Sequence, residues 1–124
     1  MKIEEAESLQ VDLSTWALKI SDMLYLRDGW NSYSAPAPNG EAIVNAHKFL
    51  NDAAIAPVRV APSAVGGVGI TYRNGDRKVY VEFFNAGGAH GLFADDLKQE
   101  THTLPVDLEC PGLFVEKIGD YIHG

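Results

Sequence analysis

The fold of this chain is decided by the stretch Thr71-Tyr72-Arg73-Asn74-Gly75-Asp76-Arg77-Lys78-Val79. At its centre, Asn74-Gly75 has the composition of a type I′ turn, in which both central residues need positive φ. Asparagine tolerates that conformation and glycine adopts it freely. The pair therefore predicts a two-residue loop between two antiparallel strands, and this hairpin fixes a sheet in the second half of the chain.

The residues on both sides of this turn alternate in matching phase. With Asn74-Gly75 as the loop, Ile70 lies opposite Val79 and Val68 lies opposite Val81. Branched aliphatic side chains of both strands then share one face, which we expect to be the core side. The other face is expected to be half solvated.

Two further strands are expected beside this hairpin. Gly87-Gly88 predicts a second tight turn, which places Phe83 opposite Leu92 on a third strand. The segment 58–61 lies between prolines, which cannot donate to a ladder, so it predicts an edge strand. Residues 95–103 are polar and predict a turn-like connection. The expected sheet is an antiparallel meander of three to four strands.

Apolar residues at helical spacing predict two helices before the sheet and a short helix after it. The first helix carries a stripe from Leu9 to Leu24, and the second begins at an N-cap, Asn39. The third contains residues 114–122, with Pro111 near its first turn. We therefore expect an α+β fold with the helices packed against the sheet, in a single domain of residues 1–124.

Composition limits the kinds of partner. The 124 residues include 17 acidic and 10 basic side chains, which give a formal net charge of -7. This charge repels phosphate backbones, so we expect no direct nucleic-acid contact and favour a protein partner with basic character. No apolar run reaches the roughly 18 to 20 residues needed to cross a bilayer, and the single cysteine, Cys110, excludes an intramolecular disulfide. The expected location is the cytoplasm, without membrane contact.

The segment from Arg27 to Pro38 holds two aromatic residues, Trp30 and Tyr33, beside two prolines. Exposed aromatic side chains in a loop are typical anchors of protein interfaces. The alternative is that both rings fill the gap between the helices and the sheet, with their polar tips hydrogen-bonded. The burial of Trp30 distinguishes these two interpretations.

The same segment contains Gly29-Trp30-Asn31-Ser32-Tyr33-Ser34-Ala35-Pro36, followed by a short stretch from Pro57 to Pro62 and then by Gly66-Gly67-Val68. This order resembles a pattern of small uncharacterised bacterial and phage proteins, in which a Gly-Trp-Asn/Asp-x-Tyr-x-Ala-x-Pro segment follows a first helix. The resemblance extends over roughly half of the chain. It implies a bacterial or phage source and carries over no activity, cofactor or catalytic residue.

A short stretch contains five residues of types that ligate zinc or iron: His90, Asp95, Asp96, Glu100 and His102. Their spacing matches no metal motif. Cys110 follows acidic residues, which disfavour a thiolate nucleophile. Gly66-Gly67-x-Gly69 leads into a strand rather than a helix, so it predicts a bulge or a close backbone approach and not a phosphate loop. We expect no metal, no cofactor and no catalytic residue.

The leading hypothesis is a non-enzymatic protein-interaction module that inhibits a partner protein, of the antitoxin, immunity or anti-defence type. The outward sheet face is expected to mix aromatic and charged side chains, a composition suited to docking another protein. The expected contact residues are Trp30, Tyr33, Tyr72 and Tyr80, with Asp95 and Asp96 steering a basic partner.

Two alternatives stay open. The first is a small-molecule-binding domain or small enzyme, with a pocket between the glycine-rich strand and the Trp30 loop in which His90 acts as acid or base. The second is a structural homodimer, formed through the sheet edges or through the exposed sheet face.

Overall fold

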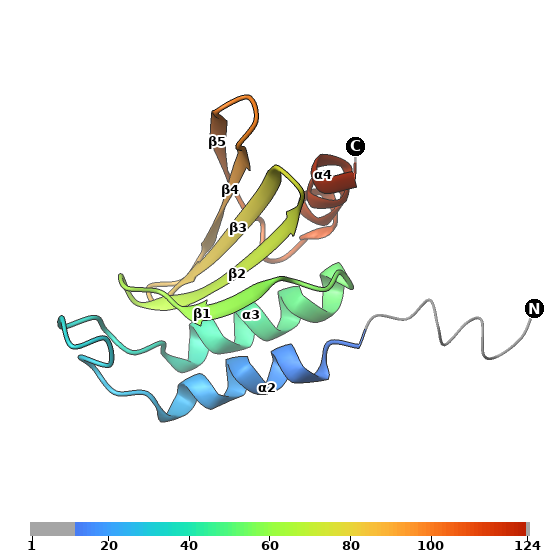
Figure 1. Cartoon of the computed structure of the whole chain (residues 1–124). Coiled ribbons are helices and arrows are strands. Elements are labelled where there is room, and N and C mark those ends of the chain that lie inside the picture. The colour runs from blue at the N-terminus through green and yellow to red at the C-terminus, as the bar shows by residue number, and fades with distance from the viewer. Residues whose placement is uncertain (1–11, 124) are drawn as a thin grey trace, which may run out of the picture.

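The computed structural model describes residues 12–123 and has an α+β architecture (Figure 1). Its elements are α2 (Ser14–Asp22), η1 (Met23–Tyr25), α3 (Gly40–Ala53), β1 (Arg59–Pro62), β2 (Gly67–Asn74), β3 (Arg77–Phe84), β4 (Ala89–Asp95), β5 (Glu100–Pro105) and α4 (Gly112–His123). The strands form one antiparallel sheet in the order β1-β2-β3-β4-β5. The predicted fold class is confirmed, with one strand more than the expected three to four.

The helices of the described residues all pack on one face of this sheet. In Figure 1, α2 and α3 run side by side below the strands, and α4 stands beside the β2–β3 hairpin. The strand side chains on the face toward the helices are buried in the core. They are Val68, Ile70, Tyr72, Val79, Val81, Phe83 and Phe93. None of these described helices is long and apolar enough to cross a membrane. The part of the predicted first-helix stripe that includes Leu9 lies outside the described residues.

The second and last helices begin where the sequence predicts. The Asn39 side chain accepts a hydrogen bond from the backbone N–H of Ala42 at 2.9 Å, which caps α3. The helix ends at Ala54, which has positive φ of 51°. Pro111 directly precedes α4, whose buried side is Phe114, Ile118 and Ile122. These contacts hold both helices against the sheet.

The first hairpin forms at the predicted place, but its loop is Gly75-Asp76 rather than Asn74-Gly75. Asn74 pairs with Arg77, and Tyr72 pairs with Val79. Within the turn only Gly75 has positive φ, 61°, as in a type II′ turn, which needs that conformation at its first central residue alone. The Asn74 side chain instead donates to the carbonyl of Ile122 at 2.5 Å, which ties the hairpin to α4.

The second hairpin differs more from the expectation, because its loop has four residues, 85–88, rather than two. Phe83 pairs with Ala89 and not with Leu92, a shift of three residues. An odd shift exchanges the two faces of a strand. Consequently Phe93 enters the core, and Leu92 lies on the opposite face.

The polar residues 95–103 were expected to form a turn, but Glu100–Pro105 is a fifth strand. The prediction is wrong because buried and exposed side chains do not alternate along this strand. All of them are exposed except the half-buried Leu104. It pairs with β4, so β4 is an inner strand and β5 is the edge. Glu100 and Pro105 at its ends are residues that discourage pairing with a further strand. At the other edge, β1 confirms the edge strand predicted for residues 58–61.

The glycine-rich entry to β2 is a site of close backbone approach, as one reading of the sequence predicts. Gly67 has φ of 138°, and a Cβ at this position would overlap the carbonyl oxygen of Phe83 on β3. Gly66 lies against Pro36 and Asn85. Glycine is therefore required where three segments meet.

A first prediction concerns Tyr72, which is 0% exposed and whose hydroxyl has no hydrogen-bond partner among residues 12–123. Burying an unpaired hydroxyl costs free energy, so Tyr72→Phe should leave the free energy of unfolding unchanged or raise it by about 1 kcal/mol. Burial raises the pKa of this phenol. The unfolded chain therefore releases the proton near pH 10 while the folded chain keeps it, and stability falls as the pH rises above that value.

The measurement is urea unfolding of both proteins at neutral pH and above about pH 10. Tyr72→Phe should lose part of the alkaline destabilisation, whereas Tyr33→Phe, at an exposed position, should keep it. A large loss of stability in Tyr72→Phe at neutral pH would show that the hydroxyl has a partner and would contradict the prediction.

A second prediction concerns Gly67. Gly67→Ala forces a Cβ onto the Phe83 carbonyl at a positive φ, so it should lower the free energy of unfolding by about 3 kcal/mol or more. Gly112→Ala is the matched control, because a Cβ there meets open space at the start of a helix. Chemical denaturation of the two variants tests this; equal stabilities would refute the close approach.

Candidate interaction surface on the open face of the sheet

One face of the sheet, here called the open face, is covered by no helix of the described residues. Strand pairing brings laterally adjacent residues onto it: Arg59, Thr71, Tyr80, Leu92 and Thr103 form one row across all five strands. Next to this row lie Gly69, Glu82 and His90 on one side and Arg73, Lys78 and Ala94 on the other. The open face thus combines half-buried apolar and aromatic groups with exposed charges.

The charge of the open face differs from that of the whole chain. Three cations, Arg59, Arg73 and Lys78, lie on it, against one strand carboxylate, Glu82. The chain as a whole has a formal charge of -7. Among the described strand residues, this face therefore carries more basic than acidic side chains.

A hollow of about 270 Å³ opens on this face over β1, β2 and β3. Its polar lining comes from Arg59, Ser63, Thr71, Lys78 and Tyr80, and we call it the Arg59 hollow. These residues are up to 21 positions apart in the chain, and the antiparallel register brings them together.

The Tyr80 ring lies in this hollow in space that is left by the missing side chain of Gly69. A Cβ at Gly69 would lie 2.6 Å from the ring carbon Cε1, so any other residue would displace the ring. Burial raises the pKa of the Tyr80 phenol and the charge of Glu82 adds to this, while the Ser63 hydroxyl and Arg59 act in the opposite direction. The phenol is protonated at neutral pH and can donate a hydrogen bond.

Ser63 forms the wall of the hollow at the β1–β2 turn. Its side chain is buried and its hydroxyl donates to Oε2 of Glu82. Its backbone N–H donates to the carbonyl of Gly67 at 2.9 Å. A buried hydroxyl with these bonds holds the turn and orients the Glu82 carboxylate.

The segment from Arg27 to Pro38, here called the Trp30 loop, places its two aromatic residues in different surroundings. Trp30 is half-buried and its Nε1–H donates to the carbonyl of Pro36 at 3.2 Å, so it stabilises the loop itself. Tyr33 is 84% exposed at the loop surface. The Asn31 side chain accepts from the backbone N–H groups of Tyr33 and Ala35 at 2.9 and 3.2 Å. Trp30 is thus partly engaged in the loop itself and Tyr33 is fully available at its surface; the anchor role of both stays a prediction.

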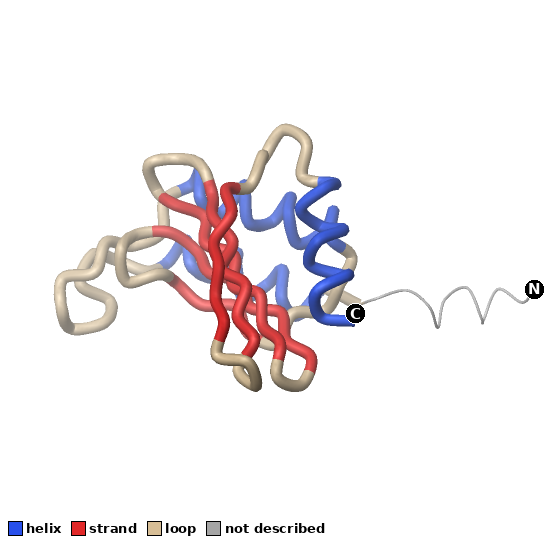
Figure 2. Tube along the Cα trace, turned by 90° about the horizontal axis from the view of Figure 1, so that it is seen from above, coloured by secondary structure: helices blue, strands red, loops and turns tan. Residues whose placement is uncertain are grey.

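Asn85 connects this loop to the end of the sheet. Its side chain accepts from the N–H of Asn39 at 2.8 Å and donates to the carbonyl of Ala37 at 2.8 Å, and its backbone N–H donates to Gly66 at 3.1 Å. Figures 1 and 2 both show the loop at the end of the sheet that holds the turns 63–66 and 85–88. Gly66 of the glycine-rich entry to β2 lies against Pro36 of this loop, so the two segments between which a pocket was expected are in contact at this point.

Two of the predicted contact residues, Tyr72 and Asp95, are buried, and a third, Asp96, is exposed but paired with an arginine. Tyr72 is fully buried because it shares its parity with Val68 and Ile70, so it cannot contact a partner. Asp95 is buried and lies 3.4 Å from Arg77, and Asp96 lies 3.2 Å from Arg73. Each aspartate is therefore paired with an arginine at the hairpin end, and their role as steering charges stays a prediction.

The residues of metal-ligating type do not converge. His90 is on the open face and packs edge-on against Phe84 with ring centroids 5.7 Å apart. His102 is on the other face, stacked on Phe93 at 4.9 Å. Within residues 12–123, no three His, Cys, Asp or Glu side chains are placed to hold a metal ion. Cys110 is exposed before α4.

A second surface, a groove between β5 and α4, was not predicted. It is lined by Phe93, His102, Leu104 and Tyr121 in a hollow of about 320 Å³. Arg77 lies over the Tyr121 ring at 5.2 Å. This surface depends on β5, the strand that alternation could not predict.

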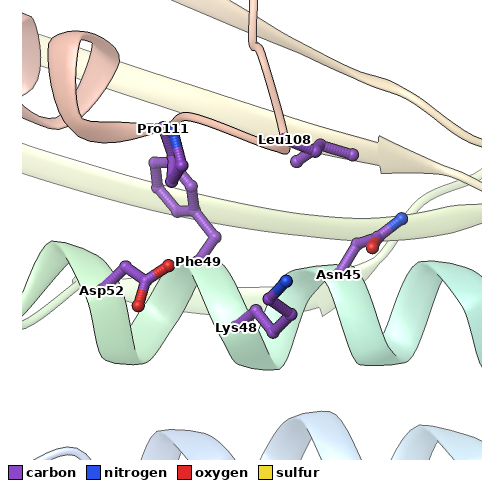
Figure 3. Close-up of a pocket in the computed structure, with 6 residues that line it drawn as sticks. All are labelled: Asn45, Lys48, Phe49, Asp52, Leu108 and Pro111. Carbon is purple, nitrogen blue, oxygen red and sulfur yellow. The ribbon is translucent and has the colours of Figure 1, made fainter.

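A crevice between α3 and the segment before α4 is a packing feature. Figure 3 shows Phe49 of α3 reaching toward Pro111, with Lys48 and Asp52 beside it. Its free volume is about 10 Å³. That is space for one water at most, so it is no ligand site.

No protein-family model matches the chain, and comparison with curated proteins and with solved structures gave no significant match. The resemblance to small bacterial and phage proteins, and the source that it implies, therefore stay predictions.

A third prediction concerns acid stability. The pKa of the Asp95 carboxyl is lowered, chiefly because Oδ1 accepts the N–H of Lys98 at 3.1 Å, with a further contribution from the charge of Arg77. A lowered pKa in the folded state gives stability that is present above the ordinary value of 3.8 and is lost as the pH falls through the lowered value. Asp95→Asn should remove this acid-sensitive contribution to the free energy of unfolding.

This contribution is measured by urea unfolding at a series of pH values from about pH 6 down to about pH 2. The stability of Asp95→Asn should change less over this range than that of the unmodified protein. Asp52→Asn, at an exposed position on α3, should behave like the unmodified protein. Parallel pH profiles for the Asp95 variant and the unmodified protein would exclude the assigned role.

Proposed function

We propose that this chain is a non-enzymatic protein-interaction module that covers part of a partner's surface with the open face, and that it inhibits this partner in the manner of an antitoxin, immunity or anti-defence protein. One observation carries the proposal. Tyr80, Phe84 and Leu92 are half-buried on a sheet face that no described helix covers, among exposed cations. Aromatic and apolar groups surrounded by charge are typical of an interface core and its rim.

The open face is supported by a rigid frame. Five paired strands hold its side chains, and the absence of a side chain at Gly69 lets the Tyr80 ring lie against the sheet. A surface that is ordered before binding loses little conformational entropy on association. Tyr33 adds an exposed aromatic group on a loop whose backbone is hydrogen-bonded through Asn31 and Asn85.

The local charge favours an acidic contact patch on the partner. Arg59 and Lys78 form no ion pair with another described residue, whereas the acidic Asp95 and Asp96 are paired with arginines. Complementary charge speeds association and selects the partner. The net charge of the chain favoured a basic partner; the distribution of charge on the open face supports an acidic patch there instead.

A fourth prediction tests this face with a purified partner. The partner is first isolated by affinity purification from the source organism and identified by mass spectrometry. Tyr80→Ala and Leu92→Ala should each weaken its binding about tenfold or more, which is about 1.4 kcal/mol or more, because each removes a group from the proposed interface core. Calorimetric titration gives the dissociation constants.

Leu113→Ala on α4 is the matched control, since this leucine is 73% exposed on the helical side. It should bind like the unmodified protein. Unchanged affinity in both open-face variants would refute the proposed surface. A partner whose own activity persists at saturating amounts of this protein would refute inhibition while leaving the interaction intact.

A further inference from the structure

We propose that the Arg59 hollow binds a small planar organic molecule that carries an oxyanion group, either a carboxylate or a phosphate. This inference goes beyond the interaction with a protein partner and does not require one. It rests on the charges, donors and shape of the hollow.

The first step is the available positive charge. Arg59 and Lys78 both line the hollow, and neither forms a salt bridge within residues 12–123. The other arginine on this face, Arg73, is already paired with Asp96 at 3.2 Å. A guanidinium presents a planar fork that binds carboxylate or phosphate through two hydrogen bonds, and an ammonium adds a point charge. The hollow therefore holds two unpaired cations with matching chemistry.

The second step is the set of neutral donors. The hydroxyls of Thr71 and Tyr80 line the same hollow. The pKa of the Tyr80 phenol is raised by burial, so its proton is present at neutral pH and is available to an oxyanion. Hydrogen bonds to a charged acceptor are stronger than those between neutral groups.

The third step is the one opposing charge nearby. The Glu82 carboxylate accepts the hydroxyl proton of Ser63, whose side chain is buried in the turn. This hydrogen bond holds the carboxylate at the wall of the hollow without cancelling its charge. The lining itself carries two cations, Arg59 and Lys78, against this one carboxylate beside it.

The fourth step is the shape. A volume of about 270 Å³ corresponds to about nine water molecules at about 30 Å³ each. This is slightly below the range of drug-sized pockets, so the ligand must be small. The Tyr80 ring, which lies over Gly69, and the apolar Ala61 and Pro62 provide walls on which a planar group can pack.

The fifth prediction uses three ligands of the same ring size. The ¹⁵N-labelled full chain is titrated at neutral pH and constant ionic strength with benzoate, phenyl phosphate and the neutral benzamide, and amide shifts are followed by NMR. Benzoate, phenyl phosphate or both should give saturable shifts in residues 59–63, 69–71 and 78–82, and benzamide should not. The anion that saturates at the lower concentration identifies the oxyanion class.

Variants then locate the charge. Arg59→Gln and Lys78→Gln should each weaken anion binding about tenfold, as expected for loss of a charge-assisted hydrogen bond. Arg27→Gln is the matched control: it removes one positive charge from an exposed residue outside the hollow. It should leave the affinity within about twofold.

Three results would overturn the proposal. They are benzamide binding as tightly as the anions, equal weakening in Arg27→Gln and Arg59→Gln, and no saturable shift with either anion. Tight benzamide binding would show that the ring alone makes the contact. Equal weakening would show that the net charge of the protein, and not Arg59, governs binding. The absence of saturable shifts would show that the hollow binds neither anion. None of these results depends on a protein partner, so they leave the proposed interaction to its own test.

Discussion

The pairing of β2 with β3 is the constraint on which the rest of the structure depends. Both α3 and α4 pack against these two strands, and the buried side chains of one face of this pair form the centre of the core. The pairing also determines which side chains lie on the open face, because successive side chains along a strand point to opposite faces of the sheet. Gly67, pressed against the Phe83 carbonyl, and Asn74, bonded to Ile122, hold the two ends of this pair in place.

The extent to which the sequence predicts this fold follows from the range of the interactions. Local sequence signals were sufficient to predict the N-cap Asn39, the hairpin at Gly75 and the α+β class. The exact loop was not predictable, because Asn74 is drawn out of the turn by a residue 48 positions away. The fifth strand exposes Thr101 and Thr103 on one face and Glu100 and His102 on the other, so no alternation of apolar and polar residues marks it.

The candidate surface was predicted in part. Tyr80 was expected on an outward face and lies there, whereas Tyr72 lies in the core; its shared parity with Val68 and Ile70 was a signal present in the sequence. Sequence spacing could not bring Arg59 and Lys78 together, because their proximity depends on the registers of two strand pairs. The ion pairs of Asp95 and Asp96 were not predictable for the same reason, since Arg77 and Arg73 reach them only across the folded sheet.

The uneven placement of charge has a consequence at long range. The open face carries the unpaired cations Arg59 and Lys78 in a chain whose formal charge is -7, so the charge of the described residues is unevenly distributed. In the field of another charged body such a molecule experiences a torque that turns it before contact, over distances near the Debye length of about 10 Å at moderate salt. Collisions with a negatively charged body are then biased toward one orientation, even though the net charges of the two repel.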